Sequence, residues 1–220
     1  MNKTGKIVFI LIEIILYCIS LAGKAVYLDE ARYIGIVLCF VYAFLCICVM
    51  KKWNRKECLI LAGLFFTCIA DYFLIIWNGY FTAGVAFFLV TQCFYFLYLT
   101  WCFPASRKVK LIIVKGFIAI VLFIMVSAVM KELVPLLFLL TFYIVLFVGN
   151  IVLGFQQFQG ERLFTIGLVL FFCCDICVGL SNANLFFTEF PYHKIFSWLI
   201  WLFYLPSQVC ISYSISKNRT

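Results

Sequence analysis

Three acidic residues, Glu13, Asp71 and Asp175, lie inside long apolar stretches of this 220-residue sequence. A charged side chain at membrane depth is costly, and it usually faces the interior of a helix bundle or a water-filled cavity. A carboxyl group in such a place can hold and release a proton, which serves acid–base catalysis as well as proton-coupled transport. These three residues are therefore the first candidates for a functional site.

Two of these acids belong to an internal repeat. The pattern G-x7-D-x6-N occurs twice, and the two copies are 104 residues apart. Its members are Gly63, Asp71, Asn78, Gly167, Asp175 and Asn182. On a helix these offsets fall within a sector of roughly 80°, so each copy predicts a small and polar stripe that ends in an amide. The repeat predicts a parallel duplication of two four-helix halves, in which both aspartates lie at one depth and face a shared cavity.

The composition places these residues in a bilayer. Hydrophobic residues make up 67% of the chain and charged residues 12%, and the mean hydropathy is +1.16. A soluble domain carries about half of its residues as apolar and about a quarter as charged, so soluble, disordered and fibrous proteins are excluded. Because one span needs roughly 20 apolar residues, the chain has room for several spans and almost no domain outside the membrane.

Eight continuously apolar segments predict transmembrane helices rather than barrel strands, whose residues would alternate. The segments cover residues 7–22, 33–50, 58–77, 79–102, 111–130, 133–155, 163–185 and 195–215. The predicted fold is an all-α integral membrane protein with eight transmembrane helices, in which residues 1–220 form a single polytopic membrane domain.

The basic residues outside the apolar segments or close to their ends predict the orientation. Thirteen of the 17 lysines and arginines fall on the face that carries both termini: Lys3, Lys6, Lys51, Lys52, Arg55, Lys56, Arg107, Lys108, Lys110, Lys115, Arg162, Lys217 and Arg219. Cytoplasmic segments are enriched in Lys and Arg, so both termini are predicted to be cytoplasmic, in a bacterial cell membrane. Six acids are assigned to loops: Glu57 and Glu161 inside, and Asp29, Glu30, Glu132 and Glu189 outside. The net charge of +8 indicates orientation and attraction to anionic lipids rather than nucleic-acid binding.

Further polar residues follow the two copies of the repeat. Gln92 and Tyr95 share a face of the fourth predicted helix, and Tyr204 and Gln208 share a face of the eighth. They are candidates for lining the cavity, and interhelical hydrogen bonding is the alternative for the two glutamines. Glu13 lies nearer the cytoplasmic end of its segment and has no counterpart, so it ranks below the aspartates.

The cysteines and the single histidine do not predict a metal centre. All twelve cysteines lie in or at the rim of apolar segments, where neither a disulfide framework nor a zinc site is indicated. His193 is the only histidine, a count that excludes membrane hydrolases whose zinc is held by several histidines. No metal and no other cofactor is expected.

Four stretches of the chain resemble the YhhN family of eight-span membrane proteins, which includes the animal lysoplasmalogenases. They are GLFFTCIADYFLI around Asp71, FTAGVAFFLVTQCFY around Gln92, GLVLFFCCDICVGLSN around Asp175, and YLPSQ at residues 204–208. The resemblance covers most of the chain from about Lys51 onward.

The chain departs from the family pattern at several positions. The family usually has a glycine where this chain has Ala70, a serine where it has Cys174, and a histidine where it has Gln92. The closing motif Tyr-Tyr-x-Ala-Gln becomes YLPSQ. Both aspartates, Tyr95 and Gln208 match the family.

The resemblance implies hydrolysis of the vinyl-ether bond of lysoplasmalogens, with release of a fatty aldehyde and a glycerophospho-headgroup. Asp71 and Asp175 would be the catalytic pair, as in glycoside cleavage, where one carboxyl group donates a proton and an ionised carboxylate stabilises the cation or activates water. The substrate would be a lyso-ether phospholipid or another lipid from the bilayer. The substrate-binding residues would be Asn78, Gln92, Tyr95, Asn182, Tyr204 and Gln208.

Two other classes of function use the same acids. A proton-coupled transporter would bind and release protons on them during alternating access. A non-catalytic lipid-binding protein is favoured by Gln92, because glutamine cannot titrate in place of an acid or base histidine. All four prolines lie off the aspartate segments, which favours a rigid cavity over the broken helices of a transporter.

Overall fold

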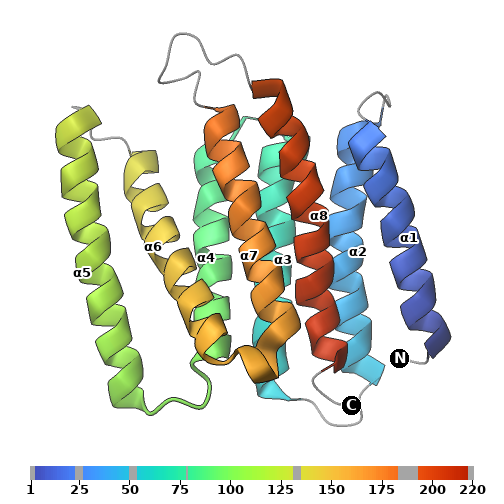
Figure 1. The fold of residues 1–220 in the computed structure, drawn as a ribbon, viewed down its shortest axis with the longest axis horizontal. Coiled ribbons are helices and arrows are strands. Elements are labelled where there is room, and N and C mark those ends of the chain that lie inside the picture. Colours follow the sequence, from blue (N-terminus) through green and yellow to red (C-terminus); the bar gives the residue numbers. More distant parts are fainter. Residues whose placement is uncertain are drawn as a thin grey trace. The chain divides into compact units, whose positions relative to one another are not determined.

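The structure is a computed structural model that describes residues 3–22, 27–49, 54–77, 79–130, 135–182 and 193–217. Eight α-helices and one π-helix make up nearly all of these residues (Figure 1). Their bounds are α1 (Lys3–Ala22), α2 (Leu28–Val49), α3 (Arg55–Asp71), η1 (Tyr72–Ile76), α4 (Phe81–Leu99), α5 (Ala105–Met130), α6 (Pro135–Gln156), α7 (Phe158–Ser181) and α8 (His193–Lys217). All eight α-helical segments are long and apolar enough to cross a membrane, which confirms the predicted fold class.

Several helices begin before the apolar segments that predict them, because their first turns are polar. α5 begins at Ala105 rather than at residue 111, so Lys108 lies inside the helix. α3 begins directly after Asn54, whose side-chain oxygen accepts a hydrogen bond from the backbone N–H of Lys56 at 3.1 Å. A helix continues wherever its backbone hydrogen bonds and caps can be made, whereas an apolar segment stops at the first charged residue.

The helices pack into two compact units, each of which contains one copy of the repeat. The first unit comprises Met1–Trp53 and Phe158–Thr220, and it holds α1, α2, α7 and α8. The second unit comprises Asn54–Gln157, and it holds α3, η1, α4, α5 and α6. Asp175 therefore lies in the first unit and Asp71 in the second. The single membrane domain expected from the sequence stays a prediction.

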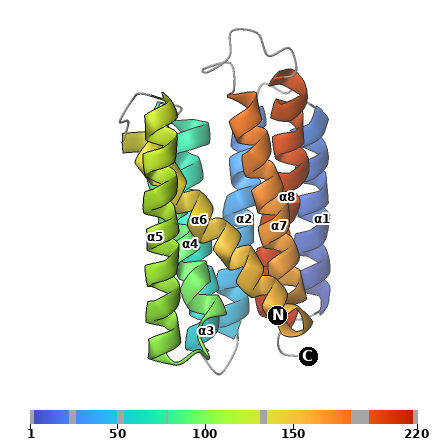
Figure 2. The same cartoon turned by 60° about the vertical axis from the view of Figure 1, so that its left-hand side comes forward.

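Each unit is organised around one central helix. In the first unit α8 packs against α7, α2 and α1. In the second unit α4 packs against α3, η1 and α6, and α6 packs in turn against α5. Figures 1 and 2 show the helices of each unit running side by side. The two hairpins that carry the repeat, α3–α4 and α7–α8, share the most extensive helix–helix contacts in the described part of the chain.

The third membrane segment changes its helical geometry directly after Asp71. In η1 the backbone N–H of Trp77 donates to the carbonyl oxygen of Tyr72, five residues earlier, at 2.9 Å. Single π-turns inside α-helices are frequent at functional sites. The sequence of this turn, YFLII, contains neither proline nor glycine and gives no sign of the change.

Candidate functional site

In the second unit, Asp71 is buried on the side of α3 that packs against α4. One helical turn before it, the hydroxyl oxygen of Thr67 lies 3.4 Å from that of Thr91. Asp71 follows Thr67 by four residues, so it points to the same side of α3 and lies roughly 6 Å farther along the axis. Its side chain is 3% exposed. The structure thus places this acid in a helix–helix contact and not on the lipid-facing surface.

The repeat glycine of α3 allows a close approach of α4. The ring of Tyr95 lies directly against Gly63, because a Cβ atom at that position would overlap the ring. The hydroxyl group of Thr91 donates to the carbonyl oxygen of Gly63 at 3.2 Å. Tyr95 is fully buried. Gly63 is therefore a packing position, and it fixes Tyr95 two turns from the level of Asp71.

Gln92 is fully buried and belongs to a chain of hydrogen bonds across α4, α6 and α5. The side-chain amide of Asn150 donates to Oε1 of Gln92 at 3.0 Å and to its carbonyl oxygen at 2.8 Å. Nζ of Lys115 donates to Oδ1 of Asn150 at 3.2 Å and lies 4.3 Å from the ring centroid of Phe96. Nε2 of Gln92 has no hydrogen-bond partner among the described residues. Gln92 thus makes an interhelical bond through its amide oxygen, and both N–H donors of its amide nitrogen are left without a partner among the described residues.

Lys115 lies farther from the start of its helix than expected for a charge assigned to the cytoplasmic face. It follows Ala105 by ten residues, so it lies roughly 15 Å from the beginning of α5. Its aliphatic stem passes over Gly149, where a Cβ atom would overlap it. A span that begins at residue 111 places Lys115 only about one turn from the membrane surface, whereas the observed start of α5 at Ala105 places it almost three turns into the helix. Pro104 was the available signal, since proline is favoured just before or at a helix start.

In the first unit, Asp175 lies on α7 at the level of Trp201 on α8. The rings of Phe171 and Tyr204 are in contact at a centroid distance of 5.4 Å. Because α7 and α8 are antiparallel neighbours, one turn onward on α7 and one turn back on α8 reach Asp175 and Trp201. Asp175 is half-buried, whereas Tyr204 is buried.

Gln208 lies beside the closest approach of α7 and α8. A Cβ atom on Gly167 would lie 2.6 Å from the side chain of Ile211 and 3.0 Å from the carbonyl oxygen of Ser207. Nε2 of Gln208 donates to the hydroxyl oxygen of Ser207 at 3.3 Å, and its Oε1 has no partner in the described part of the chain. Gln208 is fully buried and lies roughly 10 Å along the axis from the level of Asp175.

The predicted site residues divide between the units. The second unit brings together Asp71, Gln92 and Tyr95, and the first unit brings together Asp175, Tyr204 and Gln208. Asn182 is exposed at the end of α7, away from these buried groups, and Asn78 lies outside the described residues. The role of both asparagines stays a prediction.

The two hairpins share one plan of contacts. In each, the repeat glycine packs against the next helix, which carries a hydroxyl residue followed by a buried glutamine. The equivalent pairs, 104 residues apart on the first helix and 116 apart on the second, are Gly63/Gly167, Thr91/Ser207, Gln92/Gln208 and Tyr95/Ile211. The duplication itself stays a prediction, which these matched contacts support.

Two further acids extend the repeat. The assignment of Glu57 to a loop is wrong, because it lies inside α3, whereas the backbone of Glu161 is non-helical and marks a kink near the start of α7. Glu57 lies in the first turn of α3 and is 4% exposed, and Glu161 lies in the first turn of α7 and is 7% exposed. A carboxylate there is favoured by the positive end of the helix dipole. These two residues are also 104 apart, so the repeat becomes E-x5-G-x7-D-x6-N. The 104-residue spacing of Glu57 and Glu161 is present in the sequence, and it becomes part of the repeat once both acids are considered together with the helices that follow them.

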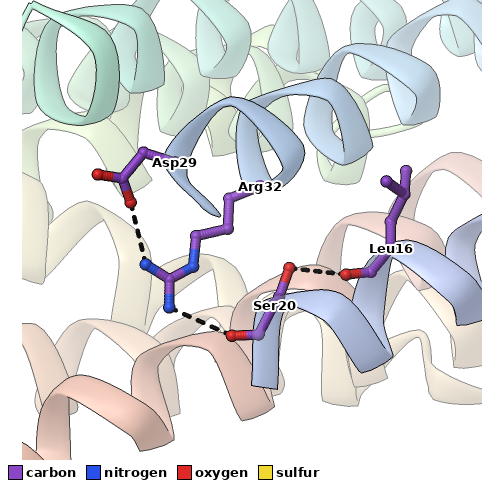
Figure 3. Close-up of polar contacts among 4 residues, drawn as sticks. All are labelled: Leu16, Ser20, Asp29 and Arg32. Atoms are coloured by element: carbon purple, nitrogen blue, oxygen red, sulfur yellow. Dashed lines mark hydrogen bonds and ion pairs between the residues drawn. The ribbon is translucent and has the colours of Figure 1, made fainter. Parts of the chain in front are cut away.

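Arg32 brings a cation to the level of Asp175. Figure 3 shows its guanidinium group donating to Oδ1 of Asp29 at 3.0 Å and to the carbonyl oxygen of Ser20 at 3.2 Å. The same group lies 4.3 Å from the ring centroid of Trp201. Arg32 therefore ties the ends of α1 and α2 to α8, a role that its count as an exterior charge does not predict.

Comparisons with known proteins identify the family to which the chain belongs. No curated protein and no solved structure matches the chain. A family model for the YhhN family matches residues 31–215, which is most of the chain and includes both aspartate helices. The match begins before Lys51, so it extends farther toward the N-terminus than the sequence motifs indicated. The resemblance is confirmed, and the chain belongs to the YhhN family.

Proposed function

We propose that this chain hydrolyses the vinyl-ether bond of lyso-ether phospholipids, releasing a fatty aldehyde and a glycerophospho-headgroup. The observation that carries the proposal is the family match, because the motifs around both aspartates resemble those of the lysoplasmalogenases. The buried polar groups around Asp71 and Asp175 support it, since an intramembrane acid needs such surroundings to take part in chemistry on a lipid.

The reaction needs only acid–base chemistry and one water molecule. A carboxylic acid transfers its proton to the alkene carbon that is not bonded to oxygen, which leaves an oxocarbenium ion. Water adds to the carbon bonded to oxygen and loses a proton, which gives a hemiacetal. The hemiacetal collapses to the aldehyde and the free glycerol hydroxyl. A second, ionised carboxylate stabilises the cation or accepts the proton from water.

The two aspartates differ in their surroundings in a way that suits this division of work. A dry environment favours the protonated form of a carboxyl group. We assign proton donation to Asp71, which is the more buried, and the role of the ionised carboxylate to the half-buried Asp175. Nε2 of Gln92 and Oε1 of Gln208 supply the uncommitted amide groups that hold a lipid hydroxyl or a water molecule.

Substitution of the aspartates tests the proposal. Asp71→Asn and Asp175→Asn should each lower aldehyde release from a lysoplasmalogen by at least about 10²-fold, the usual contribution of a positioned acid or base. The double variant should be no slower than the slower single variant, because groups that act as a unit have non-additive effects. Size-exclusion profiles in detergent should match wild type. Full activity in either single variant would reject the catalytic pair.

The Gln92→His variant distinguishes two possibilities: that this chain is a hydrolase, or that it binds lipid without cleaving it. An imidazole nitrogen can accept the hydrogen bond from Asn150, so the fold should tolerate the change. A wild-type protein that binds lyso-ether lipid but releases no aldehyde, beside an active Gln92→His variant, would show that this chain binds lipid without cleaving it.

A proton-coupled transporter is the second candidate, and the π-turn directly after Asp71 favours it. Transporters bind their substrates and ions where membrane helices are interrupted. Substrate-driven proton flux in proteoliposomes, abolished by Asp71→Asn and accompanied by no aldehyde release, would replace the hydrolase by the transporter.

A further inference from the structure

A cavity of about 210 Å³ lies between α1 and α8 of the first unit. Its walls are largely apolar, with Ile10 and Ile14 on one side and Leu205 and Val209 on the other. Ile10 and Ile14 are 37% and 51% exposed, so the cavity borders the surface that faces lipid. The cavity is smaller than the roughly 300–1,000 Å³ of a drug-sized site. Its size suits an aliphatic chain with a small polar group.

Glu13 lines this cavity, and one of its two buried carboxyl oxygens has no hydrogen-bond partner among the described residues. Its Oε1 accepts a hydrogen bond from Sγ of Cys39 at 3.4 Å, whereas its Oε2 has none among the described residues. The side chain is 3% exposed. The ion pair found in the described part of the chain joins Arg32 to Asp29, and no cation pairs with Glu13 there. The carboxyl group is thus buried and only half satisfied.

Glu13 lies at the middle of α1, because the helix begins at Lys3, before the apolar segment 7–22 in which Glu13 lies nearer one end. It is ten residues from Lys3 and nine from Ala22, so it is roughly 14–15 Å from either end of the helix. Phospholipid headgroups stay at the membrane surface, about half of the 30 Å hydrocarbon thickness away. A partner for this carboxyl group must therefore carry its polar group into the bilayer interior.

The other polar group of the cavity is already engaged. Pro206 has no N–H to donate to the carbonyl oxygen of Leu202, four residues earlier in α8. The hydroxyl group of Tyr17 donates to that carbonyl oxygen instead, at 3.3 Å. The Glu13 carboxyl group is the acidic group of the lining, and its unpartnered Oε2 lies beside Gly35 of α2 and next to Leu205, so a ligand in the cavity reaches it by displacing the Leu205 side chain.

We infer that this cavity binds a membrane-soluble aliphatic amine, whose chain fills the apolar space and whose ammonium group pairs with Glu13. A buried carboxylate is costly unless it is paired and hydrogen-bonded, and an ammonium group provides both the charge and the donor. Half of the site lies on α1, outside the residues matched by the family model. The amine site is therefore separate from the proposed hydrolysis and does not depend on it.

Carbodiimide coupling tests the inference directly. Dicyclohexylcarbodiimide adds to the carboxyl group to give an O-acylisourea, and a bound primary amine then attacks the acyl carbon, forming an amide and releasing dicyclohexylurea. With dodecylamine as the probe, the peptide of residues 7–24 should carry the amide, and Glu13 is the only acid in that peptide. The yield should saturate with amine concentration. Dodecanol and dodecane should not compete with dodecylamine at equal concentration.

Three variants fix the site. Glu13→Gln should give no adduct on this peptide, and Val209→Phe, which fills the cavity, should lower the coupling yield at sub-saturating amine by about tenfold, the equivalent of 1.4 kcal/mol. Val41→Phe is the matched control, because Val41 is 39% exposed on α2 of the same unit and does not line the cavity. It should couple like wild type.

Several results would overturn the inference. A coupling yield that rises without saturation, or that is equal in Val209→Phe and Val41→Phe, would mean that the amine reacts with Glu13 by random collision and is not bound in the cavity. If dodecanol lowers the coupling yield of dodecylamine at equal concentration, the site recognises a neutral hydrogen-bond donor and not an ammonium group. A Glu13 that forms neither an N-acylurea nor an amide would be out of reach of membrane-soluble molecules. Because Glu13→Gln should keep aldehyde release unchanged, failure of the amine site and failure of the hydrolase are distinguishable.

Discussion

At the scale of single residues, the chain Lys115–Asn150–Gln92 determines how a cation and a candidate ligand-binding amide are held inside the membrane. Asn150 is the centre of the chain, since it accepts from Lys115 and donates twice to Gln92. An unpaired buried charge costs more than the absence of both partners, because the remaining group loses its water without compensation. The centre of this chain, Asn150, and its charged end, Lys115, should therefore respond differently to mutation.

Asn150→Leu should be more destabilising than Lys115→Met. The first change leaves the ammonium group and Gln92 without their bonds and should lower stability by about 2–3 kcal/mol, whereas the second removes the charge and should cost about 1 kcal/mol or less. Thermal unfolding in detergent measures both, and Lys115→Met/Asn150→Leu should recover part of the loss. The reverse order would show that Lys115 does not depend on Asn150.

At the scale of helices, the two repeat glycines set how closely each hairpin packs. Both face a neighbouring helix with no room for a methyl group: Gly63 meets the ring of Tyr95, and Gly167 meets Ile211 and the backbone of Ser207. Small residues at such crossings are the usual means of close packing in membranes, where the hydrophobic effect does not drive helices together. The glycines of the repeat are thus explained by packing, and the acids and amides are left to carry the chemistry.

Gly63→Ala and Gly167→Ala should each destabilise the protein by about 1–3 kcal/mol, the usual cost of overpacking a close contact. Gly179→Ala is the matched control on α7, because a Cβ atom there meets nothing within 4 Å. It should be neutral or stabilising by up to about 1 kcal/mol, through helix propensity. Melting temperatures compare the three. Equal effects at Gly167 and Gly179 would contradict the close packing of α7 against α8.

At the scale of the whole molecule, the distribution of charge predicts the orientation of the chain. An even number of spans returns the C-terminus to the side of the N-terminus, and the excess of Lys and Arg indicates that this side is the cytoplasm. Removing α1 should move the N-terminus outside and leave the other seven spans in place.

Reporter fusions test this orientation. Green fluorescent protein should fluoresce at either terminus, and alkaline phosphatase should be inactive after the C-terminus but active after Ser181, because it folds only outside the cytoplasm. Active alkaline phosphatase at the C-terminus would mean an odd number of spans or the opposite orientation.

The sequence determined the membrane class and the helices, and it singled out two aspartates as candidates, because continuous apolarity and a repeated spacing can be recognised in the sequence alone. It located the helix ends poorly, since caps such as Asn54 and polar first turns such as that of α5 continue a helix past its last apolar residue. It also missed the π-turn after Asp71, which no residue type announces.

Only the tertiary structure decided what each polar residue does. Asn150 bonds Gln92 across 58 positions, and Tyr17 donates to a carbonyl oxygen of α8 across 185. Glu13 is buried, whereas Lys115 is half-buried with its ammonium group bonded to Asn150. These pairings arise from helices that are distant in sequence and adjacent in space, so no spacing within one segment can reveal them. In a membrane each buried polar group must find its partner inside the protein, and which partner it finds depends on how the helices pack.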